Sequence, residues 1–216
     1  MQKELSMDTR EVIRFVKDMK PNDHAILFYD TLESKHTILF NFLSAGLDEE
    51  KGAFYVCSEE KPEQIRREME AFGLDVKKFE KENALKIYNY DEWYIEDGKA
   101  ESVRILAHAT QAYEKFQQIG LKGMHGAGEM GCFFEYNQVK ELLRYEYALH
   151  RVLKIPAEII CAYNIQDIVV AGYMEVIMPL TRAHSWSIFT GPYGFVVHNP
   201  ENVEDSDIEK LLQIKI

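Results

Sequence analysis

Lys35 stands at the position of a phosphate-binding lysine. It follows an apolar run at 25–29, within the polar segment 29–37 that leads into a helical pattern. A phosphate loop of the form G-x-x-x-x-G-K-[ST] has its lysine at this point, and its glycines let backbone N–H groups turn towards the phosphates. Here the segment contains no glycine, and Glu33 would place a carboxylate beside a phosphate. We expect a degenerate phosphate loop; the alternative is an ordinary helix start, with Ser34 as its N-cap and Lys35 in solvent.

Glu129 is the acidic residue that could complete such a site. It lies in the glycine-rich segment 126–131, after a weaker strand pattern at 121–127. In nucleotide hydrolases an acidic residue near this place binds magnesium or orients the attacking water. Three glycines around one carboxylate predict a tight turn that a ligand can approach closely, whereas the alternative is a simple turn with an exposed glutamate. His125 is expected to point into the same cleft, with a hydrogen-bonded structural role as its alternative.

Aromatic side chains gather where the predicted strands end and on one long helix. A tyrosine offers an apolar ring with one polar group, which suits a pocket for a small or planar organic molecule. The set could equally fill a large core. Its members are Tyr29, Tyr55, Tyr88, Tyr90, Trp93, Tyr94, Tyr145 and Tyr163.

The cysteines give little sign of a metal or a nucleophile. Cys57, Cys132 and Cys161 are far apart and form no C-x-x-C pair, which fits a reducing cytoplasm. A zinc site needs three or four ligands that meet in space, and no short spacing pairs Cys132 or Cys161 with His125 or His184. The apolar context of Cys161 argues against a nucleophilic thiolate. We therefore predict no metal, no cofactor and no catalytic residue.

Composition excludes two classes of partner. The chain has 25 basic and 36 acidic residues, a formal charge of −11, which disfavours non-specific binding to nucleic acid. The charged N-terminus does not resemble a signal peptide, and no apolar stretch approaches the roughly 18 residues of a membrane span. We expect a cytoplasmic protein without a direct nucleic-acid or membrane partner.

Alternating apolar runs and amphipathic patterns must position these residues. Strands are predicted at 25–29, 53–57, 85–88, 121–127 and 158–163, and helices at 8–19, 37–47, 62–73, 101–119 and 137–153. The segment 165–178 is expected to be helical, and 194–197 to form a short closing strand. Such alternation predicts a three-layer α/β fold with a mainly parallel sheet and helices on both faces. We predict one domain over 1–216, with a flanking helix in 1–20 and a helical tail in 201–216, and a ligand site at the carboxyl ends of the strands.

Several short segments share the pattern of one family. They are His24 to Tyr29, Gly46-Leu47, Tyr55 to Glu60, Ile65 to Asp75, Gly128-Glu129-Met130, Tyr145-Glu146, Cys161-Ala162-Tyr163 and His184. Together they resemble the methanogen/methylotroph sensory domain, MEDS, a relative of KaiC-like and RecA-like ATPases. The resemblance covers about residues 22–190. It implies a RecA/KaiC-like fold with a degenerate phosphate loop and a sensory module for a small organic ligand. The candidate ligand-binding residues are Tyr29, Lys35, His125, Glu129, Tyr145, Glu146, Cys161, Tyr163 and His184.

The leading functional prediction is a non-catalytic sensory domain in signal transduction. Family members are often joined to an output domain; in this chain we expect output through a partner, such as a regulator or a histidine kinase, and a monomer or homodimer. One alternative is a nucleotide-binding ATPase that uses Lys35 and Glu129. A second is a protein-interaction module without a ligand.

Overall fold

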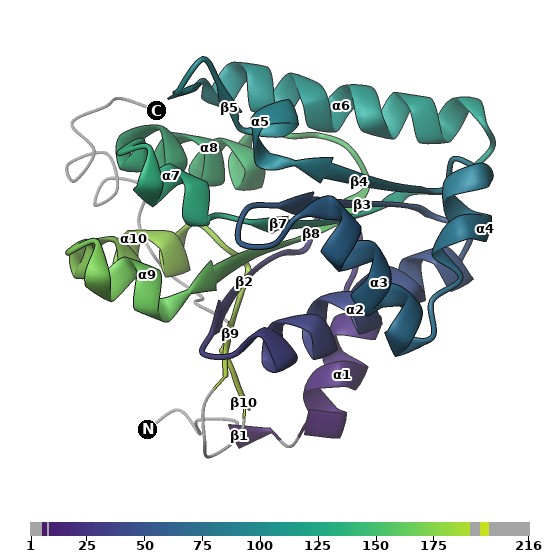
Figure 1. Ribbon diagram of the computed structural model, residues 1–216, viewed down its shortest axis with the longest axis horizontal. Helices are drawn as coiled ribbons and strands as arrows, with labels where there is room; N and C mark the ends of the chain where they lie inside the picture. Colours follow the sequence, from purple (N-terminus) through teal and green to yellow (C-terminus); the bar gives the residue numbers. More distant parts are fainter. Residues whose placement is uncertain (1–5, 8, 191–194, 199–216) are drawn as a thin grey trace.

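A mainly parallel sheet forms the middle of three layers in the computed structural model, which describes residues 6–7, 9–190 and 195–198 (Figure 1). The strands of this sheet are β1 (Ser6–Met7), β2 (His24–Tyr29), β3 (Gly52–Cys57), β4 (Leu85–Asn89), β7 (Met124–Glu129), β8 (Ala157–Asn164), β9 (Trp186–Phe189) and β10 (Phe195–His198). A separate short hairpin pairs β5 (Ile95–Glu96) with β6 (Lys99–Ala100).

The helices lie on both faces of the sheet. They are α1 (Thr9–Lys17), α2 (Leu32–Asp48), α3 (Pro62–Phe72), α4 (Val76–Lys81), α5 (Tyr90–Trp93), α6 (Ser102–Gln118), α7 (Gly131–Glu135), α8 (Val139–Arg151), α9 (Ile165–Val170), the 3₁₀ helix η1 (Met174–Val176) and α10 (Ile177–Arg182). Figure 1 shows α6 and α8 on one side of the sheet and α1, α2 and α3 on the other.

The strand order is β1-β10-β9-β2-β8-β7-β3-β4. The pairs from β9 through β2, β8, β7 and β3 to β4 are parallel, and β10 and β1 join the β9 end in antiparallel pairs. All six residues of β2, β3 and β7 are buried. Continuous burial is typical of parallel strands covered on both faces.

Alternate residues of each strand divide the core into two halves. Ile26 and Phe28 of β2 pack with Cys161 of β8 against α6 and α8. Leu27 and Tyr29 pack towards α1, α2 and α3. The position of a side chain in its strand therefore decides which face of the sheet it lies on.

The predicted three-layer α/β fold is confirmed, and most element bounds agree within a few residues. The fourth strand lies later than predicted, because Gly126 and Gly128 are strand residues and no turn forms there. A Cβ on Gly126 would lie 2.4 Å from the Phe54 ring, and one on Gly128 would lie 1.9 Å from the hydroxyl of Tyr94. These glycines make room for aromatic rings. Glycine has a low strand propensity, so the sequence pattern did not predict that the strand continues through them.

Other differences concern short elements. The predicted helix at 137–153 is preceded by α7, and the segment 165–178 contains α9 and η1 and runs into α10. Among the short elements, α4, α5, β1, β9 and the β5–β6 hairpin were not predicted from the sequence. The helical tail predicted for 201–216 lies outside the described residues.

Candidate functional site

Lys35 lies in the first turn of α2 and is fully buried. Thr31 is the N-cap of this helix and accepts a hydrogen bond from the backbone N–H of Ser34. The alternative of a solvent-exposed lysine behind a Ser34 cap is therefore wrong. The helix begins at Leu32 and not at residue 37, where the apolar pattern begins, because the N-cap Thr31 sets the helix start.

Three carboxylates surround the ammonium of Lys35. Its Nζ lies 2.7 Å from Oε1 of Glu129, 2.9 Å from Oε2 of Glu60 and 3.2 Å from Oε2 of Glu59. We call these four residues the lysine–carboxylate cluster. The ammonium has three N–H donors, and each has a carboxylate partner within the chain.

Glu129, at the end of β7, is held by further donors. The hydroxyl of Tyr55 donates to its Oε1 at 2.6 Å, and the backbone N–H groups of Ser58 and Glu59 donate to its Oε2 at 2.7 and 2.6 Å. Only about 1% of this residue is exposed. With Lys35, these donors hold both carboxylate oxygens of Glu129 in place beneath the first turn of α2.

The two other carboxylates also have several partners. Glu59 accepts hydrogen bonds from the hydroxyl of Tyr29 at 2.7 Å and from the amide of Asn164 at 2.9 Å. The Nε2 of His36 lies 2.7 Å from Glu60. Burial disfavours the Glu60 carboxylate, but hydrogen bonds from His36 and Lys35 outweigh it and lower its pKa to about 2. Burial also disfavours the charged amine of Lys35, but Glu129 and the other carboxylates raise its pKa.

A second polar group lies on the other face of the sheet. It contains His24 at the start of β2, Glu146 on α8, Cys161 in β8 and His184 in the turn after α10. All four residues are buried, and one potential ligand atom from each lies within 4.8 Å of the others. We call them the histidine–cysteine cluster.

Close contacts connect this cluster. Nε2 of His24 lies 3.3 Å from Oε2 of Glu146 and 3.4 Å from Sγ of Cys161, and Nε2 of His184 lies 3.4 Å from the same Glu146 oxygen. The hydroxyl of Tyr163 donates to Oε1 of Glu146. Burial lowers the pKa of His24 to about 3 and raises the pKa of the Cys161 thiol well above its usual value. Burial opposes ionisation of Glu146, but the imidazoles of His184 and His24 outweigh it and lower its pKa.

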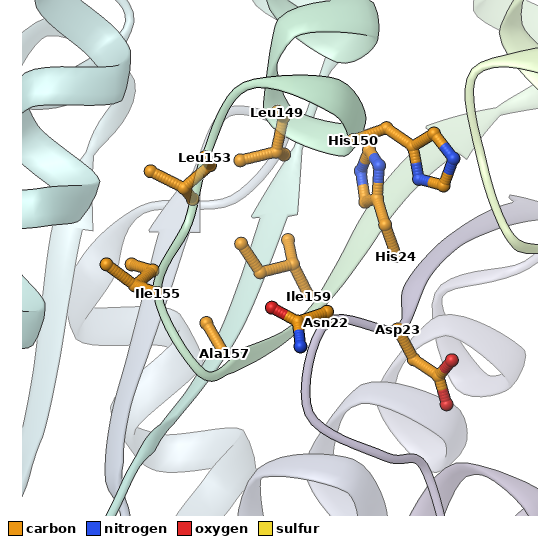
Figure 2. Close-up of a pocket in the computed structure, with 9 residues that line it drawn as sticks. All are labelled: Asn22, Asp23, His24, Leu149, His150, Leu153, Ile155, Ala157 and Ile159. Carbon is orange, nitrogen blue, oxygen red and sulfur yellow. The ribbon is translucent and has the colours of Figure 1, made fainter.

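A shallow depression reaches one member of this cluster from the surface. It lies between the loop before β2, the end of α8 and the start of β8, and His24 and His150 form part of its wall (Figure 2). Their rings stack at 6.2 Å between centroids. The cavity volume is about 20 Å³, which is room for about one water molecule rather than an organic ligand.

The structure places seven of the nine predicted ligand-binding residues in or beside the two clusters. Tyr29, Lys35 and Glu129 meet on the α2 face, while Glu146, Cys161, Tyr163 and His184 meet on the α8 face. Tyr145 packs against the rings of Tyr94 and Phe133 in the core.

His125 belongs to neither cluster. It lies near the start of β7, so the expectation that it shares a cleft with Glu129 at the strand's other end is wrong. Its Nδ1 lies 2.8 Å from the carbonyl oxygen of Phe42, and its Nε2 lies 3.3 Å from Lys51 and 3.5 Å from Glu158. The later position of the fourth strand explains the error, because it moves His125 to the amino end.

Three members of the clusters were not among the predicted site residues. Glu59 and Glu60 follow β3 directly, and their place at a strand's carboxyl end was the available signal. His24 begins β2 at the amino end, where ligand sites are not expected. Its contact with Cys161 depends on β2 pairing with β8, and the strand order is not visible in the sequence.

The sequence of this chain matches the model of one known protein family. Residues 23–184 match the model of the MEDS family, described as the methanogen/methylotroph, DcmR sensory domain. The chain belongs to the MEDS family. The match spans most of the chain and both clusters, so a sensing role follows for this MEDS domain at the level of the family.

Solved structures agree on the fold. A KaiC-like protein from the archaeon Pyrococcus horikoshii OT3 is similar with a TM-score of 0.54 and 17% identity, over 82% of this chain and 90% of that one. An uncharacterized Pyrococcus horikoshii protein, solved with an unknown peptide, has a TM-score of 0.61 and 15% identity, over 91% and 92% of the two chains. At these identities the likeness shows a KaiC/RecA-like fold alone.

A search of curated proteins gives no significant match. Among the described residues, each helix is too short or too polar to cross a bilayer.

Proposed function

We propose that this MEDS domain is a non-catalytic sensory module that binds a small organic molecule and passes the signal to a partner protein. The observation that carries the proposal is the buried ammonium of Lys35, which three carboxylates of the chain already contact. In a working phosphate loop this ammonium is available to the phosphates of a nucleotide.

The charge around Lys35 argues against the ATPase alternative. One ammonium faces the carboxylates of Glu59, Glu60 and Glu129, so the cluster carries an excess of negative charge. A triphosphate would have to displace two or three of these hydrogen-bonded carboxylates and then lie beside them. Like charges at such distances repel strongly where water is excluded. The lysine therefore acts as a structural cation that joins α2 to the loop after β3 and to the end of β7.

Aromatic rings at the carboxyl ends of β2, β8 and β9 support a site for an organic ligand. Phe28 stacks on Phe189 with 5.1 Å between centroids and lies 5.7 Å from the ring of Tyr163. Phe134 lies 6.3 Å from Tyr163 and 6.0 Å from Tyr173. Tyr173 and Phe189 are half-buried, so a molecule arriving from solvent meets ring surface there. Such surface binds small apolar or planar molecules.

Thermal unfolding tests the proposal directly. A ligand at about 100 times its dissociation constant stabilises the folded state by about 2.7 kcal/mol. For a chain of this size the midpoint then rises by about 5–10 °C. We expect no such shift with magnesium–ATP and a shift of this order with a member of a panel of small organic compounds. A clear rise with magnesium–ATP would instead support the ATPase.

A matched pair of variants tests the location of the ligand. Phe189→Ala removes a half-buried ring from the aromatic group and should weaken binding of an organic ligand at least tenfold. Phe79→Ala removes a half-buried ring that packs against the other half of the core, and binding should be unchanged. Equal loss in both variants would argue against the carboxyl edge.

A sensory module passes its signal to an output component. We propose a regulator or a histidine kinase in this role, with the domain itself a monomer or homodimer. Light scattering after size-exclusion chromatography tests the oligomeric state, and a trimer or larger ring would contradict it.

A further inference from the structure

We propose that His24, Glu146, Cys161 and His184 bind one divalent transition-metal ion of the zinc class in a four-coordinate site. This site is distinct from the aromatic group at the carboxyl edge, and the proposal does not depend on the identity of any organic ligand. It rests on the positions of the four side chains, on their hydrogen-bond partners and on their burial.

The spacing of the four side chains fits a tetrahedral ion. Zinc binds nitrogen and oxygen at about 2.0–2.2 Å and thiolate sulfur at about 2.3 Å, so neighbouring ligand atoms lie about 3.3–3.6 Å apart. The contacts of Glu146 with His24 and His184 measure 3.3 and 3.4 Å, and the contact of His24 with Cys161 measures 3.4 Å. All four ligand atoms lie within 4.8 Å of one another, so a small inward movement completes the shell.

Hydrogen bonds outside the cluster orient two of the ligands. Nδ1 of His184 lies 2.6 Å from the carbonyl oxygen of Leu180 and must donate to it, so the neutral ring presents the lone pair of Nε2 towards the centre. Tyr163 donates to Oε1 of Glu146 and leaves Oε2 for the ion. A carbonyl behind the histidine and a donor behind the carboxylate are the usual supports of metal ligands.

Two atoms that point into the cluster have no hydrogen-bond partner among the described residues. They are Oε2 of Glu146 and Nε2 of His184, both in residues that are at most 2% exposed. When His184 is neutral, with its proton on Nδ1, both atoms are acceptors, 3.4 Å apart. Buried acceptors without a donor are costly to a folded protein. A cation between them and Cys161 would satisfy both.

The donor set selects the class of metal. Two imidazole nitrogens, one sulfur and one carboxylate suit zinc, cobalt or iron, whereas calcium and magnesium take oxygen ligands. On binding, the thiol of Cys161 loses its proton to solvent and forms the metal–sulfur bond. Four protein ligands fill the coordination shell, as in sites that hold a metal for structure or regulation. His24 lines the surface depression, which gives the ion a short route to the cluster (Figure 2).

Cobalt(II) titration of the full chain, purified with a chelator that is then removed, tests the proposal. We expect one equivalent to bind with the visible bands of tetrahedral cobalt and a thiolate-to-cobalt charge-transfer band, and zinc to displace it. The double variant Cys57→Ala and Cys132→Ala leaves Cys161 as the remaining cysteine. It should keep the charge-transfer band, while Cys161→Ala should lose it.

A second matched pair addresses the histidines. His184→Gln should lower cobalt affinity at least tenfold, while His125→Gln, which changes a buried histidine outside the cluster, should leave it unchanged. If the ligand variants fail to fold, the wild type and the double cysteine variant still decide the question. A folded wild type without the charge-transfer band, or a folded double variant that has lost it, would overturn the proposal. These outcomes are the ones expected if His184 and Glu146 form only an ion pair with each other and the cluster binds no metal. Failure of every organic ligand to bind would leave the cobalt result unaffected.

Discussion

Nζ of Lys35 lies 2.7 Å from Oε1 of Glu129, joining the first turn of α2 to the last residue of β7 across 94 positions of sequence. Both groups are buried, and Tyr55 donates to the same carboxylate oxygen. From the sequence, these two positions are the ones that a phosphate and its magnesium would occupy in a nucleotide site. Here the two side chains form an internal ion pair.

The first prediction concerns the stability that this ion pair provides. Lys35→Met removes the ammonium and leaves Glu59, Glu60 and Glu129 together without their cation. Breaking a buried pair on one side costs about 3–5 kcal/mol of unfolding free energy, measured by urea denaturation. Lys77→Met, at an exposed lysine, is the control and should change little. A loss below about 1 kcal/mol for Lys35→Met would show that the carboxylates reach water or protonate at little cost.

The second prediction is an acid-sensitive contribution from Glu60. Its pKa is lowered from 4.5 to about 2 in the folded chain. Between these values the unfolded chain binds more protons than the folded one, so stability falls as pH drops from about 5 towards 2. Glu60→Gln should flatten this fall in unfolding free energy between pH 5 and 3. Glu63→Gln, at an exposed glutamate in the first turn of α3, should leave the slope as in the wild type.

The third prediction tests the close packing of β7 against an aromatic ring. A Cβ at residue 128 would lie 1.9 Å from the hydroxyl oxygen of Tyr94 and 3.2 Å from the ring carbon that bears it. Gly128→Ala should therefore cost about 1–3 kcal/mol or more through overpacking. Adding Tyr94→Phe removes the clashing oxygen and should recover part of this loss. A double variant that is no more stable than Gly128→Ala alone would show that the backbone of β7 is the limiting feature.

The fold was predictable because its strands are continuous apolar runs. Two of the four residues of the lysine–carboxylate cluster and one of the four of the histidine–cysteine cluster were not predicted. Runs such as those of β2 and β8 indicate strands buried on both faces, whatever their neighbours. Lys35 and Glu129 could be paired in advance because both lie at carboxyl ends, where parallel strands bring loops together. His24 and Cys161 meet because β2 pairs with β8, a neighbour that follows it only after five other strands of the chain, β3 to β7. No spacing in the sequence carries that information.

The last prediction uses the hydroxyl of Tyr163, which donates to Glu146, to test whether this carboxylate is a ligand of the proposed metal ion. This hydroxyl donates to Glu146, and its ring lies 5.7 Å from Phe28 in the aromatic group. Tyr163→Phe keeps the ring and removes the donor that orients the carboxylate. Loss of such a support lowers metal affinity by about 10–100-fold, so the cobalt titration should shift by this factor while the charge-transfer band persists. Tyr173→Phe removes a hydroxyl that contacts Asn137 instead, and its titration should match the wild type. Equal cobalt affinity in the wild type and Tyr163→Phe would mean that Glu146 needs no orientation, and would weaken the case for it as a ligand.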